Sequence, residues 1–304
     1  MKRFICLISA LIVLCNMSFF VNADISTVEN DDTTYKLLSA IEIFNNNDLS
    51  LLGSSNYVKR SEFVDYVVRM IKGNDISFDE TKLIADVSKQ NAYYKSVMIA
   101  YNLGIISKNT VAFEPDRTIT YTEAVTMILR ALGYGDVCDN KNGYPIGYIT
   151  YATEIDLMDG IDCDFSSGLK YTGLSKLIYN AVNAPLLNAV YFSDSYTEYK
   201  KNEERNILSE YYDVYKKEGI VSANEFTALS LHDSYYTGSI EIEGNRYLIS
   251  DGLYNEYLGY YVTLFYKDNK GAATDEAICI FENDNTVKNI LHKDVNNIHN
   301  RIYP

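Results

Sequence analysis

The chain has 304 residues and a formal net charge of −14 at pH 7, with 41 acidic against 27 basic residues. Proteins that follow nucleic-acid backbones need basic patches, so this charge argues against a nucleic-acid partner. The length fits two domains better than one.

Residues 1–23 have the layout of a secretory signal peptide. Lys2 and Arg3 form a basic start, residues 4–14 are almost all apolar, and Ala23 offers a small residue for cleavage. A membrane anchor is one alternative, but polar residues interrupt the run before the roughly 20 apolar residues that a spanning helix needs. A lipoprotein attached at Cys15 is another, although Leu14 precedes it where a small residue is required. We therefore expect a secreted protein without a membrane span once the signal is removed.

Three cysteines lie beyond that segment: Cys138, Cys163 and Cys279. An odd number at irregular spacing argues against a disulfide framework and against a zinc site. Two arrangements stay open. In one, Cys138 and Cys163 form a disulfide bridge; in the other, all three thiols are free. No metal or other cofactor is predicted.

Three segments of the N-terminal half align with one another: residues 57–73, 118–134 and 168–184. Each begins with a short polar stretch and continues with apolar residues at the i, i+3, i+4, i+7 spacing that buries one face of a helix. An earlier apolar pattern recurs in step with them, at residues 40–43, 100–103 and 152–155. Thr120 and Glu123 form a capping box, which marks a helix start. Each unit is therefore predicted to be a helix–loop–helix.

The middle segment resembles the repeat of the S-layer homology family. The matching motifs are Ala85-Asp86-Val87, Leu103 to Ser107, Phe113 with Pro115, Ile119-Thr120 with Glu123, and Ala131 to Tyr134. The third segment carries Gly143 to Tyr148, which resembles a G-Y-P-x-G-Y turn found in part of the family. The first is recognised by Lys59 to Glu62. The likeness covers residues 35–187.

The resemblance implies an α+β protein whose N-terminal region is all-α and built of three repeats, at residues 35–80, 81–135 and 136–190. It also implies a trimeric arrangement of the repeats. Their grooves would bind secondary cell-wall polysaccharide, which is often pyruvylated. The family's arginine suits this ligand, because a planar guanidinium binds a ketal carboxylate through two hydrogen bonds.

Four residues are candidates for the polysaccharide site by this resemblance: Arg60, Asp86, Tyr121 and Tyr171. Arg60 keeps the family's arginine, whereas tyrosines take its place in the other two repeats, and Gly173 replaces an acid in the third. Alternative roles stay open for all four. Arg60 could pair with a nearby acid, Asp86 could cap a turn, and the tyrosines could stack on sugar rings or pack inside the fold.

Residues 191–202 are predicted to be a linker, and residues 203–304 a helix followed by a small, mostly antiparallel β domain. The helix is expected over residues 203–217, ended by Gly219. Apolar and polar residues alternate over 239–243, and with residues 246–249 this predicts a hairpin. Residues 260–266 and 276–281 are predicted to form a second strand pair. Residues 218–224 and 257–262 resemble the linker domain that often follows such repeats.

No catalytic motif accompanies these segments. The three histidines, His232, His292 and His299, occur late in the chain without a paired nucleophile motif. G-x-S-x-G, P-loop and H-E-x-x-H sequences are absent. The acidic residues between 156 and 164 lack the order of an EF-hand loop and are expected to be solvated.

The sequence thus predicts a non-catalytic protein of the cell wall or S-layer of a Gram-positive bacterium, held non-covalently by wall polysaccharide. Two alternatives stay open. In one, the repeats mediate assembly as a homotrimer or with other surface-layer proteins. In the other, the chain is an anchored enzyme that acts on polysaccharide.

Overall fold

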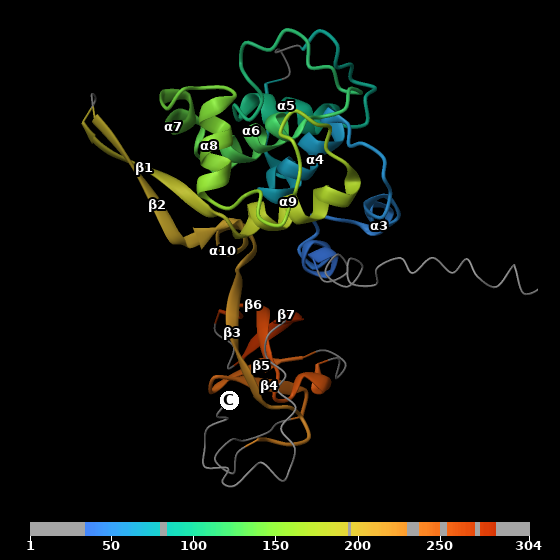
Figure 1. Cartoon of the computed structure of the whole chain (residues 1–304), viewed down its shortest axis with the longest axis vertical. Coiled ribbons are helices and arrows are strands. Elements are labelled where there is room, and N and C mark those ends of the chain that lie inside the picture. The colour runs from blue at the N-terminus through green and yellow to red at the C-terminus, as the bar shows by residue number, and fades with distance from the viewer. Residues whose placement is uncertain are drawn as a thin grey trace, which may run out of the picture. The chain divides into compact units, whose positions relative to one another are not determined.

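The computed structural model describes residues 34–79, 84–193, 196–229, 237–249, 254–270 and 274–283. The predicted signal peptide and the three histidines lie outside these residues. Helices occupy the first half of the described chain and strands the second (Figure 1). No helix among the described residues combines the length and the apolar character that crossing a membrane requires.

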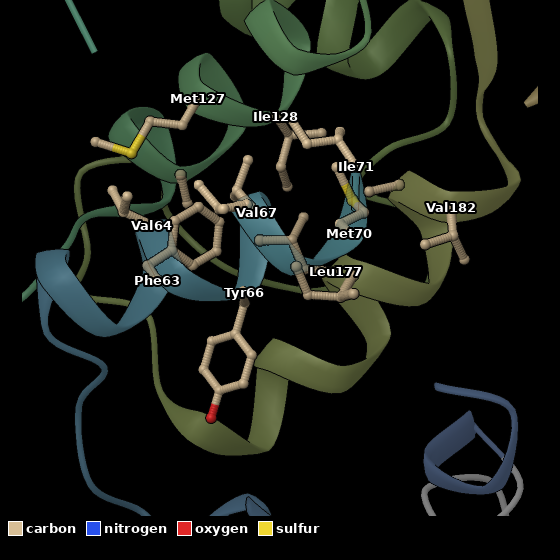
Figure 2. Close-up of a cluster of buried hydrophobic side chains, with 14 of the residues drawn as sticks. Phe63, Val64, Tyr66, Val67, Met70, Ile71, Met127, Ile128, Leu177 and Val182 are labelled. Atoms are coloured by element: carbon tan, nitrogen blue, oxygen red, sulfur yellow. The ribbon is translucent and has the colours of Figure 1, made fainter. Parts of the chain in front are cut away.

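The first half consists of short helices around one core. They are residues 34–40, α3 (Asn46–Leu52), α4 (Arg60–Met70), the 3-10 turn η1 (Gly73–Asp75), α5 (Tyr94–Asn102), α6 (Tyr121–Ala131), α7 (Gly135–Asn140), α8 (Ile146–Glu154) and α9 (Tyr171–Asn183). The apolar spacing seen in the sequence places one face of α4, α6 and α9 in this core. Figure 2 shows Phe63 and Val67 of α4, Ile128 of α6 and Leu177 of α9 gathered there, all fully buried.

Three short extended segments, one before each of α4, α6 and α9, pair with one another. The antiparallel bridges join Tyr57 to Lys170, Lys59 to Thr118, and Thr120 to Gly168. Two backbone hydrogen bonds of 2.8–3.0 Å close each bridge. We call the segments 56–60, 117–121 and 167–171 together the helix-start ring.

The central residues of the helix-start ring are Val58, Ile119 and Leu169, and all three are fully buried. Their N–H groups donate in a closed circle: Val58 to the Leu169 carbonyl, Leu169 to that of Ile119, and Ile119 to that of Val58. The segments approach so closely that a Cβ at Gly168 would lie 2.7 Å from Cγ2 of Thr118. The ring therefore fixes where the three helices begin.

The predicted all-α region of three like repeats is wrong. The helix-start ring is made of paired extended segments, and the helices between its positions are unlike. Among the described residues, residues 34–40 and α3 precede α4, the 3-10 turn η1 and α5 lie between α4 and α6, and α7 and α8 lie between α6 and α9. The reason is that helical spacing reports only local structure. The N–H groups ahead of a helix also need partners, and here they find them in segments distant in the chain.

A two-stranded antiparallel sheet follows, formed by β1 (Pro185–Ser193) and β2 (Tyr196–Asn206). It begins inside the predicted third repeat and takes in part of the predicted linker. The helix expected over residues 203–217 is present but shorter, as α10 (Ile207–Tyr212), and strands occupy the rest of that range apart from Asp213. Asn206 caps α10 by accepting the Ser209 N–H at 2.9 Å, and Asp213 ends it at a left-handed φ of 53°.

The C-terminal half is a closed barrel in the order β3-β4-β5-β7-β6. Its strands are β3 (Val214–Ala223), β4 (Ser239–Ile242), β5 (Asn245–Leu248), β6 (Tyr261–Lys267) and β7 (Asp275–Glu282), with the 3-10 turn η2 (Asn255–Tyr257) before β6. The antiparallel pairs β4–β5 and β6–β7 confirm the two predicted strand pairs. Closure was not predicted, since it depends on a parallel β5–β7 pair and on β3 bonding to both β4 and β6.

The helix-start ring generates a stability prediction. Ile119→Ala removes fully buried apolar volume from the centre of the ring and should lower the free energy of unfolding by about 2–4 kcal/mol. Ile146→Ala is the matched control, because 59 % of Ile146 is exposed, and it should change stability by less than about 0.5 kcal/mol. Urea unfolding followed by far-UV circular dichroism measures both. Equal midpoints for the two variants would contradict a central role for the ring.

Candidate functional site

Arg60 opens α4, and its side chain lies against the loop that precedes α6. Its Nε donates to the Phe113 carbonyl at 2.8 Å, and its Nη1 lies 2.7 Å from Oε1 of Glu123. The guanidinium carbon is 4.8 Å from the centroid of the Phe113 ring. Only 12 % of the side chain is exposed, and a charge this far from water needs such partners. Arg60 therefore links the start of α4 to the start of α6.

Glu123 balances two arginines. Its Oε2 accepts the Thr120 N–H at 3.0 Å, which completes the predicted capping box of α6. Arg117 binds the same carboxylate from the solvent side, with Nη2 2.6 Å from Oε1, and 40 % of the Arg117 side chain is exposed. One carboxylate thus holds a buried guanidinium and a half-exposed one.

Asp86 holds the loop to which Arg60 binds. Its Oδ1 accepts the Phe113 N–H at 2.7 Å and its Oδ2 accepts the Glu114 N–H at 2.6 Å. Glu114 has a φ of 56°, which non-glycine residues adopt uncommonly. The two hydrogen bonds offset this local cost. They place the Glu114 carboxylate 2.8 Å from Nε of Arg117.

The carboxylates of this site are held in their charged form. Desolvation acts to raise the pKa of Asp86, but the N–H groups of Phe113 and Glu114 and the charge of Arg60 keep it below its usual value. Desolvation likewise opposes the charge on Glu123, yet its hydrogen bonds from Arg117 and Thr120 and the charge of Arg60 hold its pKa down. Burial lowers the pKa of Arg60, and Glu123 opposes that shift. The group is therefore an ionic cluster at neutral pH.

Tyr171 and Tyr121 occupy the positions in α9 and α6 that Arg60 occupies in α4. The Tyr171 hydroxyl donates to Oε2 of Glu62 at 2.7 Å. Burial, and to a smaller extent the neighbouring Cys163 thiol, raise the pKa of Tyr121 to about 12. Only 6 % of Tyr121 and 5 % of Tyr171 are exposed. The described conformation therefore packs both rings inside the fold, and stacking on a sugar stays a prediction.

The three positions contact one another by one rule. We call the four aligned residues at each helix start, 59–62, 120–123 and 170–173, the tetrads. The second residue of each tetrad reaches the fourth residue of another: Arg60 reaches Glu123, Tyr171 reaches Glu62, and Tyr121 reaches Gly173. At the third contact a Cβ on Gly173 would collide with the Tyr121 hydroxyl. The glycine that replaces an acid in the sequence thus makes room for the tyrosine that replaces an arginine.

Arg60 and Asp86 both bind the loop at Phe113 and Glu114. Tyr121 and Tyr171 lie at the other two contacts of the helix-start ring. Arg117 and Glu114 were not predicted as site residues. No local motif marks them, and their place in the cluster follows from contacts with the Arg60–Glu123 pair. Cys138, Cys163 and Cys279 are free thiols. The described residues hold no group of three His, Cys, Asp or Glu side chains placed to bind a metal ion.

Comparison with known proteins gives relatives at low identity. The chain is 25 % identical over 157 residues to a cell surface protein of Thermoanaerobacter kivui, a match to 50 % of this chain and 20 % of the relative. It is 28 % identical over 166 residues to the middle cell wall protein of Brevibacillus brevis, a match that covers 53 % of this chain and 15 % of the relative. It is 27 % identical over 195 residues to a surface layer protein of Brevibacillus choshinensis, a match that covers 60 % of this chain and 17 % of the relative.

No family model matches the chain. The chain spans a fifth or less of the length of these relatives. The three relatives are nevertheless all proteins of the bacterial cell surface, cell wall or surface layer by name. The predicted location, at the cell wall or S-layer of a Gram-positive bacterium, is confirmed by these matches.

The ionic cluster predicts a defined pH dependence. The pKa of Glu123 lies below its usual 4.5 and that of Asp86 below its usual 3.8. Their stabilisation is present above those usual values and is lost as the pH falls through the lower, folded-state values. The free energy of unfolding should therefore decrease as the pH drops below about 4.5.

Glu123→Gln tests the assignment. It leaves Arg60 buried without a carboxylate and should cost about 2–4 kcal/mol at pH 7, with a shallower loss of stability between pH 5 and 3. Glu210→Gln is the control, since Glu210 pairs with Arg205 at 2.6 Å but is 38 % exposed, and it should cost less than about 1 kcal/mol. Equal effects of the two changes would contradict the account.

The contact between Tyr121 and Gly173 makes a second prediction. Gly173→Ala alone should destabilise the protein by about 1–3 kcal/mol, because the added methyl group meets the buried hydroxyl. Combining it with Tyr121→Phe removes that hydroxyl. The loss of unfolding free energy in the double variant should then be about 1 kcal/mol smaller than the sum of the losses in the two single variants. Thermal unfolding of all four proteins completes the cycle, and additive effects would rule out the contact.

Proposed function

We propose that this chain is a non-catalytic attachment module of a cell-surface protein, and that it binds secondary cell-wall polysaccharide at the cluster of Arg60, Arg117 and Asp86. Its relatives carry the names of structural surface proteins. The motifs around Leu103–Ser107 and Ile119–Glu123 support a relationship with S-layer homology proteins. The observation that carries the proposal is one carboxylate, Glu123, shared by a buried and a half-exposed arginine.

Arg117 is the group proposed to touch the ligand. Its second partner is Glu114, and 59 % of the Glu114 side chain is exposed. Exposed ion pairs contribute little to stability, so a carboxylate of an acidic polysaccharide can take the place of Glu114 at small cost. A guanidinium binds such a carboxylate through two hydrogen bonds. Pyruvyl ketals would supply the carboxylate.

The other candidate residues have supporting roles in this proposal. Arg60 holds Glu123, and Glu123 orients Arg117. Asp86 fixes the loop that carries Glu114. Tyr121 and Tyr171 keep the remaining contacts of the helix-start ring closed. The module therefore needs no catalytic group, and a wall-bound enzyme activity forms no part of the proposal.

Pelleting with isolated cell walls tests the proposal. The chain without residues 1–23 should sediment with intact Gram-positive walls and remain in solution with walls stripped of their polysaccharide. Arg117→Ala should weaken this association about tenfold, the loss expected for a charge-assisted pair. Glu114→Gln removes the competing carboxylate and should leave the association unchanged or strengthen it.

Arg205→Ala provides a matched control. Arg205 is 39 % exposed and paired with Glu210, as Arg117 is 40 % exposed and paired with Glu123, and it should have no effect on pelleting. Sedimentation with stripped walls would reject polysaccharide binding and favour assembly with other surface proteins. Full retention of the Arg117→Ala variant on intact walls would reject this site.

A further inference from the structure

The outer face of α8 lacks the charges that the solvent side of a helix normally carries. α8 packs against α6 and α7 (Figure 1), and its Tyr148 and Ala152 are fully buried. A surface helix usually has charged or polar residues opposite such an inner side. Here the opposite side carries four uncharged residues at i, i+3, i+4 and i+7, all exposed or half-exposed: Ile146, Ile149, Thr150 and Thr153. We call these four residues the α8 stripe.

Contacts on the inner side of the helix fix the orientation of the α8 stripe. A Cβ on Gly147 would lie 2.2 Å from the Cys138 carbonyl oxygen, so the start of α8 lies directly on α7. The Tyr148 hydroxyl accepts a hydrogen bond from Nε of Arg130 on α6 at 3.0 Å and donates one to Oδ1 of Asp139 on α7 at 2.9 Å. These contacts prevent α8 from turning about its axis, and the stripe therefore stays directed toward solvent.

All four residues of the α8 stripe are β-branched. Such residues form helices less readily than Ala, Glu or Lys, so the needs of the helix itself do not explain them on its solvent side. Their side chains hold few rotamers in a helix. Covering them with a partner therefore costs little conformational entropy.

The two threonines of the α8 stripe need no hydrogen bond from a partner. Oγ1 of Thr150 donates to the Ile146 carbonyl at 2.9 Å, and Oγ1 of Thr153 donates to the Ile149 carbonyl at 3.0 Å. An apolar surface can cover both residues without leaving either hydroxyl unpaired.

Charge favours a second copy of the chain as the partner of the α8 stripe. The formal net charge is −14, so two copies repel each other wherever their acidic surfaces meet. Glu154 is the only charged residue in the sequence of α8, and its Oε2 lies 3.6 Å from Nζ of Lys141. The stripe is uncharged and this neighbouring pair is neutral, so two copies can approach here without opposing like charges.

The α8 stripe is also complementary in shape to itself. Ile146 with Thr150, and Ile149 with Thr153, form two rows at i, i+4 spacing. Rows of this kind interdigitate when two helices cross at about −50°. A two-fold axis brings the same rows of both copies together, so no second, different surface is required.

We propose that the α8 stripe is a self-association surface, on which a second copy of this chain packs by its own α8 stripe. The nine residues of α8 span only about 14 Å, and the stripe covers less than the roughly 800 Å² per partner of a standard interface. The dimer is therefore weak, with a Kd on the order of 100 μM. In dilute urea unfolding the chain is monomeric, so Ile146→Ala remains a stability control. The surface shares no residue with the arginine cluster and does not depend on the function proposed for it.

Sedimentation velocity of the chain lacking residues 1–23, from about 1 to about 500 μM, tests this inference. The sedimentation coefficient should rise with concentration toward that of a dimer and not beyond, because a two-fold contact closes at two copies. Ile149→Glu places like charges opposite each other and should weaken the association at least about tenfold. Ile146→Glu, at a residue that is 59 % exposed, should do the same. Both variants should keep the far-UV circular dichroism of the folded chain.

A mixture of variants identifies the partner surface. Ile149→Lys alone should be as monomeric as Ile149→Glu. An equimolar mixture of the two should associate at least as well as the unchanged chain, because opposite charges then face each other across the two-fold axis. Val111→Glu is the matched control, since Val111 is β-branched, 78 % exposed and outside the stripe, and it should leave association unchanged.

Four results would overturn the inference. They are a chain that stays monomeric over this concentration range, normal association of both Ile146→Glu and Ile149→Glu, an equal loss in Val111→Glu, and a Glu–Lys mixture that stays monomeric. In the dilute wall-pelleting assay Ile149→Glu should behave as the unchanged chain, and Arg117→Ala should self-associate normally. Failure of this inference and failure of the proposed attachment are therefore distinguishable.

Discussion

The closed circle of backbone hydrogen bonds among Val58, Ile119 and Leu169 is the constraint on which the helical half depends. A helix leaves its first N–H groups without partners inside the helix. In this chain the residues ahead of α4, α6 and α9 supply one another with partners. The three segments are distant in the chain, so each bond closes a long loop and none can form from its own neighbourhood alone. The helices consequently start at positions that only the assembled core defines.

The contacts just beyond that circle explain why the aligned tetrads differ in sequence. Arg60 requires the acid at Glu123, because a guanidinium buried without a carboxylate would be costly. Tyr121 requires Gly173, because its hydroxyl occupies the space that a side chain there would fill. A substitution at one helix start is therefore matched at another. Of the three contacts between tetrads, only the one between α4 and α6 is a buried ion pair, because the other two tetrads carry tyrosine in place of arginine.

The sequence allowed the helices α4, α6 and α9, the Thr120–Glu123 capping box and the strand pairs β4–β5 and β6–β7 to be predicted, because their signals are local. It did not reveal the helix-start ring or the barrel closure, since the bridge from Lys59 to Thr118 and the parallel pair of Tyr247 with Asp275 join distant residues. Arg60 and Asp86 were predicted as site residues through a motif, and their role in binding stays a prediction. Arg117 was not, because its role follows from the position of Glu123 in the folded chain.

The arrangement of charges around Glu123 would allow the proposed ligand to bind without breaking the buried ion pair. If a single arginine served both purposes, a ligand carboxylate would have to displace the partner of a buried cation and would weaken the fold. Here the buried Arg60 keeps Glu123, while Arg117 carries a second, exposed partner in Glu114. In the proposed complex only that exposed pair would have to open. The helix-start ring would therefore remain closed while Arg117 exchanged Glu114 for the ligand.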